Sequence, residues 1–369
     1  MKKINIIADN SIPLIDKCLT NQCEIIVTDW TKIDNNALKQ NNTDALFIRS
    51  TVKANRQLLE NTNVKFIATA TSGYDHFDIN YLEENRIAYF SAAGCNANSV
   101  AEYVIYAIIK WIMSKNILLE NINIGIIGFG NIGKLVARYS QSLGFHILVN
   151  DPPLNDNNFD FPPYVKYADL SEIFEKCDII TNHVPLTNSG KYPTKYLLNR
   201  SLFDNLKKGT LFIHPSRGGV VIEADLLDFI DEKQITTVID VWENEPDFNS
   251  QIANSSILAT PHIAGYSYNG KLKGTMQVLQ HFENFYGIKP NYDILIEEIN
   301  KYSGKKYISI DNYWEIFRIL NDNRDFEGDF QKMLEASKLD KLGRQTFFQE
   351  IRKNYPKRYE TLSLYNNIF

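Results

Sequence analysis

The stretch NINIGIIGFGNIGKLVARYSQSLGFHILVND limits the possible folds of this chain more than any other part of its sequence. Its apolar run INIGII predicts a buried parallel strand. The following GFGNIG places Gly128, Gly130 and Gly133 in G-x-G-x-x-G spacing, and a helical apolar pattern comes next. A second predicted strand, FHILVND, ends at Asp151. Strand, glycine loop, helix, strand and terminal acid therefore occur in the order of a dinucleotide-binding unit.

Each glycine has a physical reason to be there if a dinucleotide binds. Gly128 permits the tight turn, Gly130 lets the backbone approach a pyrophosphate, and Gly133 lets helix and strand pack closely. The helix N-terminus adds free N–H groups and the positive end of its dipole. Asp151 lies 18 residues after Gly133 (151 − 133), near the roughly 20 expected for the acid that binds a ribose hydroxyl. An acid here repels a 2′-phosphate, so the sequence predicts NAD rather than NADP. A purely structural role for the loop is the alternative.

Four further stretches each combine an apolar strand with a polar loop: CDIITNHVPL, GTLFIHPSRGG, TTVIDVWENEP and SILATPHIAG. Helical stretches such as EADLLDFIDEK separate some of them. This alternation predicts an α/β fold with a doubly wound parallel sheet of the Rossmann type. Ligands bind beyond the carboxyl ends of the strands in such sheets.

Three of these predicted strands run into loops that carry Arg217, Glu245 and His262. Carboxyl ends of parallel strands share one edge of a sheet, so we expect the three side chains to converge. Oxidation of a hydroxy acid needs a base, and imidazole titrates near neutral pH. A carboxylate beside the imidazole orients it, and a guanidinium binds a substrate carboxylate. Ordinary turn or loop positions are the alternative for each residue.

Composition argues against several other classes of function. The net charge is −5 over 369 residues, which gives no electrostatic basis for binding nucleic acid or an anionic membrane. No apolar stretch approaches the roughly 20 residues of a membrane span, and MKKINIIADN resembles a first strand more than a signal peptide. The four cysteines form no C-x-x-C pair, so we expect a cytoplasmic protein without a metal.

The regions on either side of the glycine loop predict three domains. Residues 1–95 with 266–289 resemble a smaller α/β substrate domain, and residues 96–265 form the nucleotide-binding domain. Residues 290–369 are aromatic and amphipathic, and they cannot bury an apolar face alone. A long helix is expected at NSVAEYVIYAIIKWIMSKN, where Ser99 and Glu102 match a capping box.

The motifs GIIGFGNIGK, PSRGG, DVWENEP and TPHIAG, in this order, resemble the D-isomer-specific 2-hydroxyacid dehydrogenases over at least residues 40–285. The likeness is strongest to a branch that oxidises a small phosphorylated hydroxy acid. It rests there on FIRSTVKAN, FIATATSGYDHFD, SAAGCNANSVAEYV and the tail EIRKNYPKRYETLSLY. The resemblance implies that Arg217 is the catalytic arginine, Glu245 its acidic partner and His262 the proton donor or acceptor.

The resemblance further implies that the tail is an α+β dimerisation domain and that the protein is a homodimer. An intramolecular cap is the alternative for the tail. The basic stretch RKNYPKR in it could bind the substrate phosphate from a partner subunit, or could simply be a solvated helix face.

Positions that match cofactor and substrate contacts of the family follow residue by residue. Besides the three glycines and Asp151, the NAD-contacting positions are Asn131, Ile132, Val184, Pro215, Ser216, Arg217, Asp240 and Gly265. Substrate positions are Ser50, Thr71 and Tyr266. The chain departs from the family pattern at His214, where asparagine is usual, at the pair that follows it, and at Val184, which has no hydroxyl.

Two other functions remain open from the sequence. One is a different enzyme of the same family, acting on 3-phosphoglycerate or on glyoxylate and hydroxypyruvate. The other is a non-catalytic protein that binds NAD as a sensor, because proteins of that kind share this fold.

Overall fold

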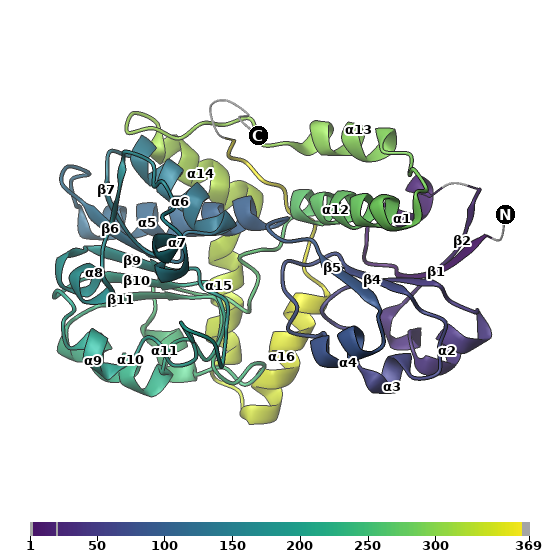
Figure 1. The fold of residues 1–369 in the computed structure, drawn as a ribbon. Coiled ribbons are helices and arrows are strands. Elements are labelled where there is room, and N and C mark those ends of the chain that lie inside the picture. The colour runs from purple at the N-terminus through teal and green to yellow at the C-terminus, as the bar shows by residue number, and fades with distance from the viewer. Residues whose placement is uncertain (1–2, 20, 364–369) are drawn as a thin grey trace. The chain divides into compact units, whose positions relative to one another are not determined.

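The computed structural model describes residues 3–19 and 21–363. They divide into two compact units (Figure 1). One unit comprises Met1–Asn96 and Tyr266–Ser303, and the other comprises Ala97–Gly265 and Gly304–Phe369.

The first unit is built on a five-stranded parallel sheet with the strand order β2-β1-β3-β4-β5. Its strands are β1 (Ile4–Asp9), β2 (Cys23–Thr28), β3 (Ala45–Ile48), β4 (Phe66–Thr69) and β5 (Ala88–Ser91). Its helices are α1 (Ile15–Cys18), η1 (Trp30–Lys32), α2 (Asn35–Gln40), α3 (Arg56–Leu59), α4 (Ile79–Glu84), α12 (Tyr268–Tyr286) and α13 (Asp293–Tyr302).

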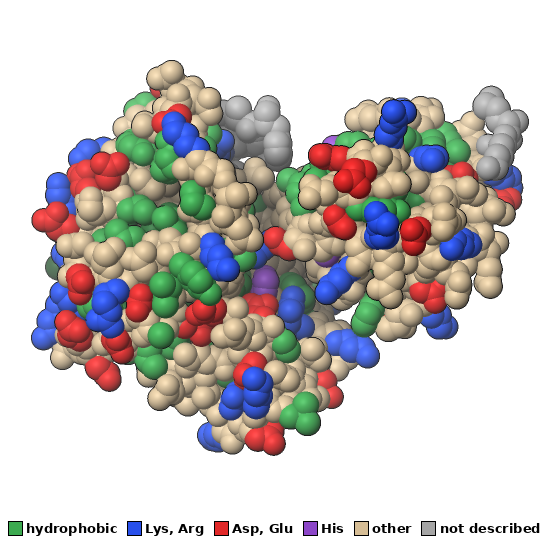
Figure 2. Space-filling model, turned by 60° about the horizontal axis from the view of Figure 1, so that its bottom comes forward, with side chains coloured by type: hydrophobic (Ala, Val, Ile, Leu, Met, Phe, Trp, Pro, Cys, Tyr) green, Lys and Arg blue, Asp and Glu red, His purple; other side chains and the backbone are tan. Residues whose placement is uncertain are grey.

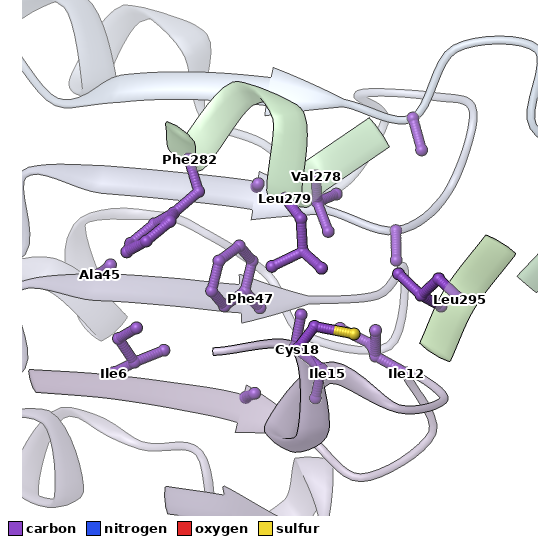
Figure 3. Packing of buried hydrophobic residues seen from close by; sticks show 14 of the residues in the cluster. Ile6, Ile12, Ile15, Cys18, Ala45, Phe47, Val278, Leu279, Phe282 and Leu295 are labelled. Atoms are coloured by element: carbon purple, nitrogen blue, oxygen red, sulfur yellow. The ribbon is translucent and has the colours of Figure 1, made fainter. Parts of the chain in front are cut away.

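Each face of this sheet buries its own apolar cluster. Alternate strand residues such as Phe47 and Phe66 meet Phe282 of α12, and the ring centroids of Phe47 and Phe282 lie 5.6 Å apart. Figure 3 shows Phe282 and Leu279 of α12 pointing onto the strands. The opposite face packs against α2, α3 and α4. Both faces of the sheet are covered, as the near-continuous apolar strands require.

The second unit carries a seven-stranded parallel sheet with the order β12-β11-β10-β9-β6-β7-β8. Its strands are β6 (Asn123–Ile127), β7 (His146–Asn150), β8 (Val165–Tyr167), β9 (Ile179–Asn182), β10 (Leu211–His214), β11 (Thr236–Ile239) and β12 (Leu258–Ala259). The chain first extends from β6 toward β8 and then returns to place β9 on the other side of β6. The doubly wound parallel sheet predicted from sequence is therefore confirmed, with its switch point between β6 and β9.

Helices connect these parallel strands. They are α5 (Ala97–Lys115), α6 (Asn131–Ser142), α7 (Pro152–Asp156), α8 (Leu170–Lys176), α9 (Arg200–Phe203), α10 (Glu223–Glu232) and α11 (Ser250–Ser255). Helix α5 is buried almost all round, which suits its apolar composition.

The capping box expected in α5 is wrong. The helix begins at Ala97, so Ser99 and Glu102 both lie inside it. Ser99 Oγ donates instead to the Ala264 carbonyl at 2.8 Å, and Glu102 forms a fully buried ion pair with Arg324. The pattern misled because side chains three residues apart on a helix also share a face that a neighbour can cover.

The C-terminal segment of this unit is helical in its described part. Helices α14 (Tyr313–Arg324), α15 (Phe326–Ala336) and α16 (Lys341–Lys353) follow one another, and Lys306 and Leu362 form an isolated bridge. Helix α14 packs on α5, and α15 packs on β12 and α11. The segment thus covers the nucleotide-binding domain of its own chain, whereas α13 belongs to the first unit. Within residues 304–363, single-bridge pairing stands where an α+β arrangement was expected.

The face in Figure 2 shows acidic and basic side chains interspersed rather than gathered by sign. Among the helices within residues 3–363, none is both long and apolar enough to cross a bilayer.

Candidate active site

The glycine loop at the end of β6 is shaped by close backbone contacts. Gly128 has φ +90°, a conformation that favours glycine, and its N–H donates to the Asn150 carbonyl at 2.8 Å. A Cβ at Gly133 would lie only 2.1 Å from the Gly128 carbonyl oxygen. The first and third glycines are therefore required by the packing of the loop on the first turn of α6.

Gly130 differs from its two neighbours because it faces open space. No atom lies within 4 Å of the position that a Cβ would take, and Gly130 is the N-cap of α6. Asn131 and Ile132 begin the helix and present its first N–H groups. The open N-terminus therefore fits a pyrophosphate.

Asp151 stands at the end of β7 beside the glycine loop. Its Oδ2 accepts from the Phe129 N–H at 2.7 Å, and its Oδ1 accepts from the Leu154 N–H at 3.1 Å. Each carboxylate oxygen keeps a further lone pair for a ribose hydroxyl. Loop, helix terminus and acid are assembled as the sequence predicted, and together they fit the adenosine end of a dinucleotide.

The ends of β9 and β10 adjoin this loop and carry two neutral histidines. Val184 Cγ1 lies 3.0 Å from the Cβ position of Gly128, so the segment after β9 borders the glycine loop. Asn182 Nδ2 lies 2.9 Å from Ser216 Oγ and 3.0 Å from His214 Nδ1. Burial lowers the pKa of His214 to about 3, and burial with a contribution from His214 lowers the pKa of His183 to about 3.

Glu245 and His262 form the contact that the sequence predicted. His262 Nδ1 lies 2.9 Å from Glu245 Oε2 and 3.1 Å from Oε1, while the Trp242 N–H donates to Oε1 at 3.0 Å. Burial opposes ionisation of Glu245, but His262, Arg352 and the Trp242 N–H outweigh it and lower the pKa of this carboxyl. An ionised carboxylate only accepts hydrogen bonds, so Nδ1 carries the proton and Nε2 keeps a lone pair for chemistry.

The turn that presents His262 is held by Asp240, which is buried directly after β11. His262 has φ +56°, a strained value for a residue with a side chain. Its N–H donates to the Asp240 carbonyl at 2.7 Å, and Asp240 carboxylate oxygens accept from Ile263 N–H at 2.8 Å and Ala264 N–H at 3.1 Å. The Thr260 hydroxyl donates a further bond at 2.6 Å. Asp240 therefore imposes the conformation that turns the imidazole toward Glu245.

Arg217 follows β10 on a loop that contacts the Glu245 loop through its glycine neighbour. A Cβ at Gly218 would lie 1.8 Å from the Trp242 carbonyl oxygen, so the two backbones touch at this point. Pro215 and Ser216 are buried there, and the Arg217 guanidinium donates to the Ser216 carbonyl at 2.8 Å. The structure thus brings Glu245 and His262 into contact and places the Arg217 loop against theirs.

Other histidines are less suited to proton transfer near neutral pH. In addition to His183 and His214, burial lowers the pKa of His76 to about 4 and lowers that of His281. Within the described residues, no group of three or more His, Cys, Asp or Glu side chains is placed to hold a metal ion.

Substrate positions Ser50, Thr71 and Tyr266 all belong to the first unit. Ser50 is exposed after β3, and Thr71 Oγ1 lies 2.7 Å from Thr69 Oγ1 at the end of β4. Their roles stay predictions, as does that of Gly265 at the end of the second unit's TPHIAG loop.

Sequence reasoning missed three supports of the site. Asp240 was expected to touch the cofactor, and its part in the His262 turn was not foreseen. Arg324 Nη2 reaches the Ala264 carbonyl at 3.2 Å, and Arg352 lies 4.0 Å from Glu245. An acid that ends an apolar strand was a readable signal for Asp240. No local pattern links α14 or α16 to residues about 60 to 110 positions earlier in the chain.

Comparisons with known proteins agree with this geometry. The family model for the D-isomer specific 2-hydroxyacid dehydrogenase NAD binding domain matches residues 110–264. An erythronate-4-phosphate dehydrogenase of Wigglesworthia glossinidia brevipalpis is 37% identical over 350 residues, which span 91% of this chain and 88% of the relative. One from Bacteroides fragilis is 36% identical over 97% of both chains.

Solved structures share the fold at lower identity. NAD-bound 3-phosphoglycerate dehydrogenase of Entamoeba histolytica aligns with a TM-score of 0.64 at 23% identity, covering 77% of this chain and 96% of that one. The glycine loop, the paired Glu245 and His262 and the full-length relatives all lead to the same assignment. This chain belongs to the erythronate-4-phosphate dehydrogenases, within the D-isomer specific 2-hydroxyacid dehydrogenase family.

Proposed function

We propose that this chain oxidises 4-phospho-D-erythronate at C2 to 2-oxo-3-hydroxy-4-phosphobutanoate with NAD, a step toward pyridoxal 5′-phosphate. The observation that carries the chemistry is the 2.9 Å contact of His262 with Glu245 on the loops that follow β12 and β11. The substrate comes from the names of relatives that match almost the whole chain.

The residues of this site account for the proton and the substrate's charge. Nε2 of His262 takes the hydroxyl proton, because Nδ1 already carries the hydrogen that faces Glu245. The Glu245 carboxylate stabilises the imidazolium that results. Arg217 binds the substrate carboxylate and polarises the oxygen at the reacting carbon. NAD, when bound, supplies the acceptor for the hydride.

We assign cofactor contacts to the residues around the glycine loop and the neighbouring strand ends. They are Gly128, Gly130, Asn131, Ile132, Gly133, Asp151, Val184, Pro215, Ser216, Arg217, Asp240 and Gly265. Ser50, Thr71 and Tyr266 are assigned to the substrate. Residues 1–95 with 266–289 would form the substrate domain.

We also propose a cytoplasmic homodimer in which residues 290–369 contribute to the interface. The packing of α14 and α15 on their own domain does not conflict with this, because the segment also exposes large apolar side chains. Trp314 and Ile310 are 53% and 51% exposed. Sedimentation of the full chain at micromolar concentration should give twice the mass of one chain, and a single-chain mass would remove this part of the proposal.

The activity is tested by following absorbance of reduced nicotinamide after adding 4-phosphoerythronate. Enzyme and NAD should be stoichiometric, so that one turnover is visible even if the product cofactor stays bound. 3-Phosphoglycerate and glyoxylate with NADH serve as matched comparisons. We expect kcat/KM for 4-phosphoerythronate to exceed that for 3-phosphoglycerate by at least about 100-fold, close to 3 kcal/mol.

Other outcomes separate the alternatives. Faster oxidation of 3-phosphoglycerate, or faster reduction of glyoxylate, would favour another activity of the family. NAD binding with no turnover of any hydroxy acid would favour a sensor.

A further inference from the structure

Helix α16 presents one face to the loop that carries Glu245. Positions 341, 344, 348 and 352 are spaced by three, four and four residues, so they share one side of the helix. All four have partners in the loop that follows β11, which contains Glu245, Asp247 and Phe248. A helix far along the chain therefore lines the loop of a catalytic carboxylate.

The middle of this face anchors the helix. Arg344 Nη2 lies 3.0 Å from Asp247 Oδ1, with the two side chains 21% and 19% exposed, and Lys341 Nζ lies 3.3 Å from Oδ2. Phe348 and Phe248 are buried and stack with ring centroids 6.2 Å apart. Buried aromatic stacking and a shielded ion pair make this a fixed contact rather than a chance approach of two surfaces.

The last position of the face reaches the catalytic acid. Arg352 Nη1 lies 4.0 Å from Glu245 Oε2, the oxygen that is also 2.9 Å from His262 Nδ1. The Arg352 guanidinium carbon lies 5.7 Å from the Phe348 ring centroid. The ring that anchors α16 thus also supports the cation, and Glu245 lies between two cationic partners when His262 is protonated.

We propose that Arg352 is a positioning residue for the Glu245–His262 pair, held by α16 so that its charge keeps the Glu245 carboxylate directed at the imidazole. The inference rests on the proposed dehydrogenase function, because it gives Arg352 a role in the same proton transfer. It places residues after 304 among the supports of catalysis as well as among the candidates for assembly.

The charge of Arg352 has a defined effect on this pair. A cation beside Glu245 favours its ionised form and disfavours a second positive charge on His262. The two groups titrate together, so the effect shows in the pair as a whole. Other charged or titratable groups also act on this pair, from β10, from the end of β11 and from the start of α10. They are His214, Asp240 and Glu223.

Loss of the Arg352 cation should make proton uptake by the pair easier. Oxidation needs an unprotonated imidazole, so the acid limb of kcat/KM should move to higher pH in Arg352→Ala. We expect a shift of about 0.5 pH unit or more, at the low end for a charge about 4 Å away because the guanidinium is partly solvated. Arg352→Lys should restore at least about half of the shift, since it keeps the charge.

Two further variants separate charge from packing. Lys338→Ala removes an exposed cation just before α16 and should leave the limb in place. Arg344→Ala loosens the helix from Asp247 but keeps Arg352, so it should lower kcat with a smaller movement of the limb.

A readout without turnover keeps this test independent of the proposed activity. NMR titration of the His262 ring in the NAD-bound protein should show its midpoint moving to higher pH in Arg352→Ala, with recovery in Arg352→Lys. If the midpoint moves while no variant oxidises 4-phosphoerythronate, the proposed function fails and the positioning role stands. If the midpoint and the limb stay in place while KM rises at least about tenfold, Arg352 binds the substrate anion directly and the inference is wrong.

Discussion

The two sides of the seven-stranded sheet are built by different means. Around β6 the loop is shaped by the absence of side chains, with Gly133 against the Gly128 carbonyl and open space at Gly130. Around β11 and β12 the loops are shaped by charge, with Asp240 holding the His262 turn and Glu245 between His262 and Arg352. The cofactor side should therefore respond mainly to added atoms, and the catalytic side mainly to removed charges.

The largest expected loss is at the imidazole itself. His262→Ala should lower kcat by roughly 10²–10⁴-fold, the usual range for a positioned general base. Affinity for NAD, measured by calorimetry without substrate, should change little because His262 serves the reacting hydroxyl. Turnover within a few-fold of the unmodified enzyme would return His262 to an ordinary turn position.

The charged side extends into the C-terminal segment through Arg324. This guanidinium and Glu102 are fully buried, and Glu102 also accepts from the Thr361 and Leu362 N–H groups. Arg324→Ala should cost about 3–5 kcal/mol in free energy of unfolding, because it leaves Glu102 buried without its cation.

The matched control is an exposed pair. Arg200 contacts Asp228 with both side chains more than half exposed, so Arg200→Ala should cost no more than about 1 kcal/mol. Equal losses for Arg324→Ala and Arg200→Ala in chemical denaturation would show that the buried network contributes nothing special.

Steric changes should dominate on the glycine side. Gly133→Ala places a methyl group 2.1 Å from a carbonyl oxygen and should cost about 1–3 kcal/mol of stability. Gly130→Ala is the internal control: it meets nothing within 4 Å, so the thermal midpoint of the unliganded protein should hold while NAD affinity falls. A matched loss of stability in both variants would contradict the geometry of the loop.

Asp151 is the one charge on the glycine side, and its effect should be smaller. NAD should exceed NADP in kcat/KM by at least about tenfold, near 1.4 kcal/mol, and Asp151→Ala should narrow that ratio. Because Asp151 also caps α7, the ratio between cofactors is more informative than either rate. Equal use of both cofactors by the unmodified enzyme would remove the role given to this acid.

The same contrast explains how much of the site could be read from sequence. Gly128, Gly133 and Asp151 act within one strand–helix–strand unit, so their spacing alone predicted their geometry. The 2.9 Å contact of Glu245 and His262 was also predictable, because neighbouring parallel strands end at one edge of a sheet.

Contacts across long sequence separations were not predictable in this way. Ser99 and Glu102 looked like a capping box, but Arg324, more than 220 residues later, pairs with Glu102 inside the helix. Arg352 reaches Glu245 only because α16 packs through Phe348 on Phe248. Such pairs depend on how helices dock, and local periodicity carries no information about docking.

The most direct test of the charged side is the pH dependence of kcat/KM in both directions for Glu245→Gln. The amide keeps the shape and removes the charge, so the imidazolium loses its stabilising partner. The acid limb of oxidation and the alkaline limb of reduction should then both move to lower pH, by about 1 unit. If neither limb moves, Glu245 does not act on His262, and the charge-built half of this site is wrong.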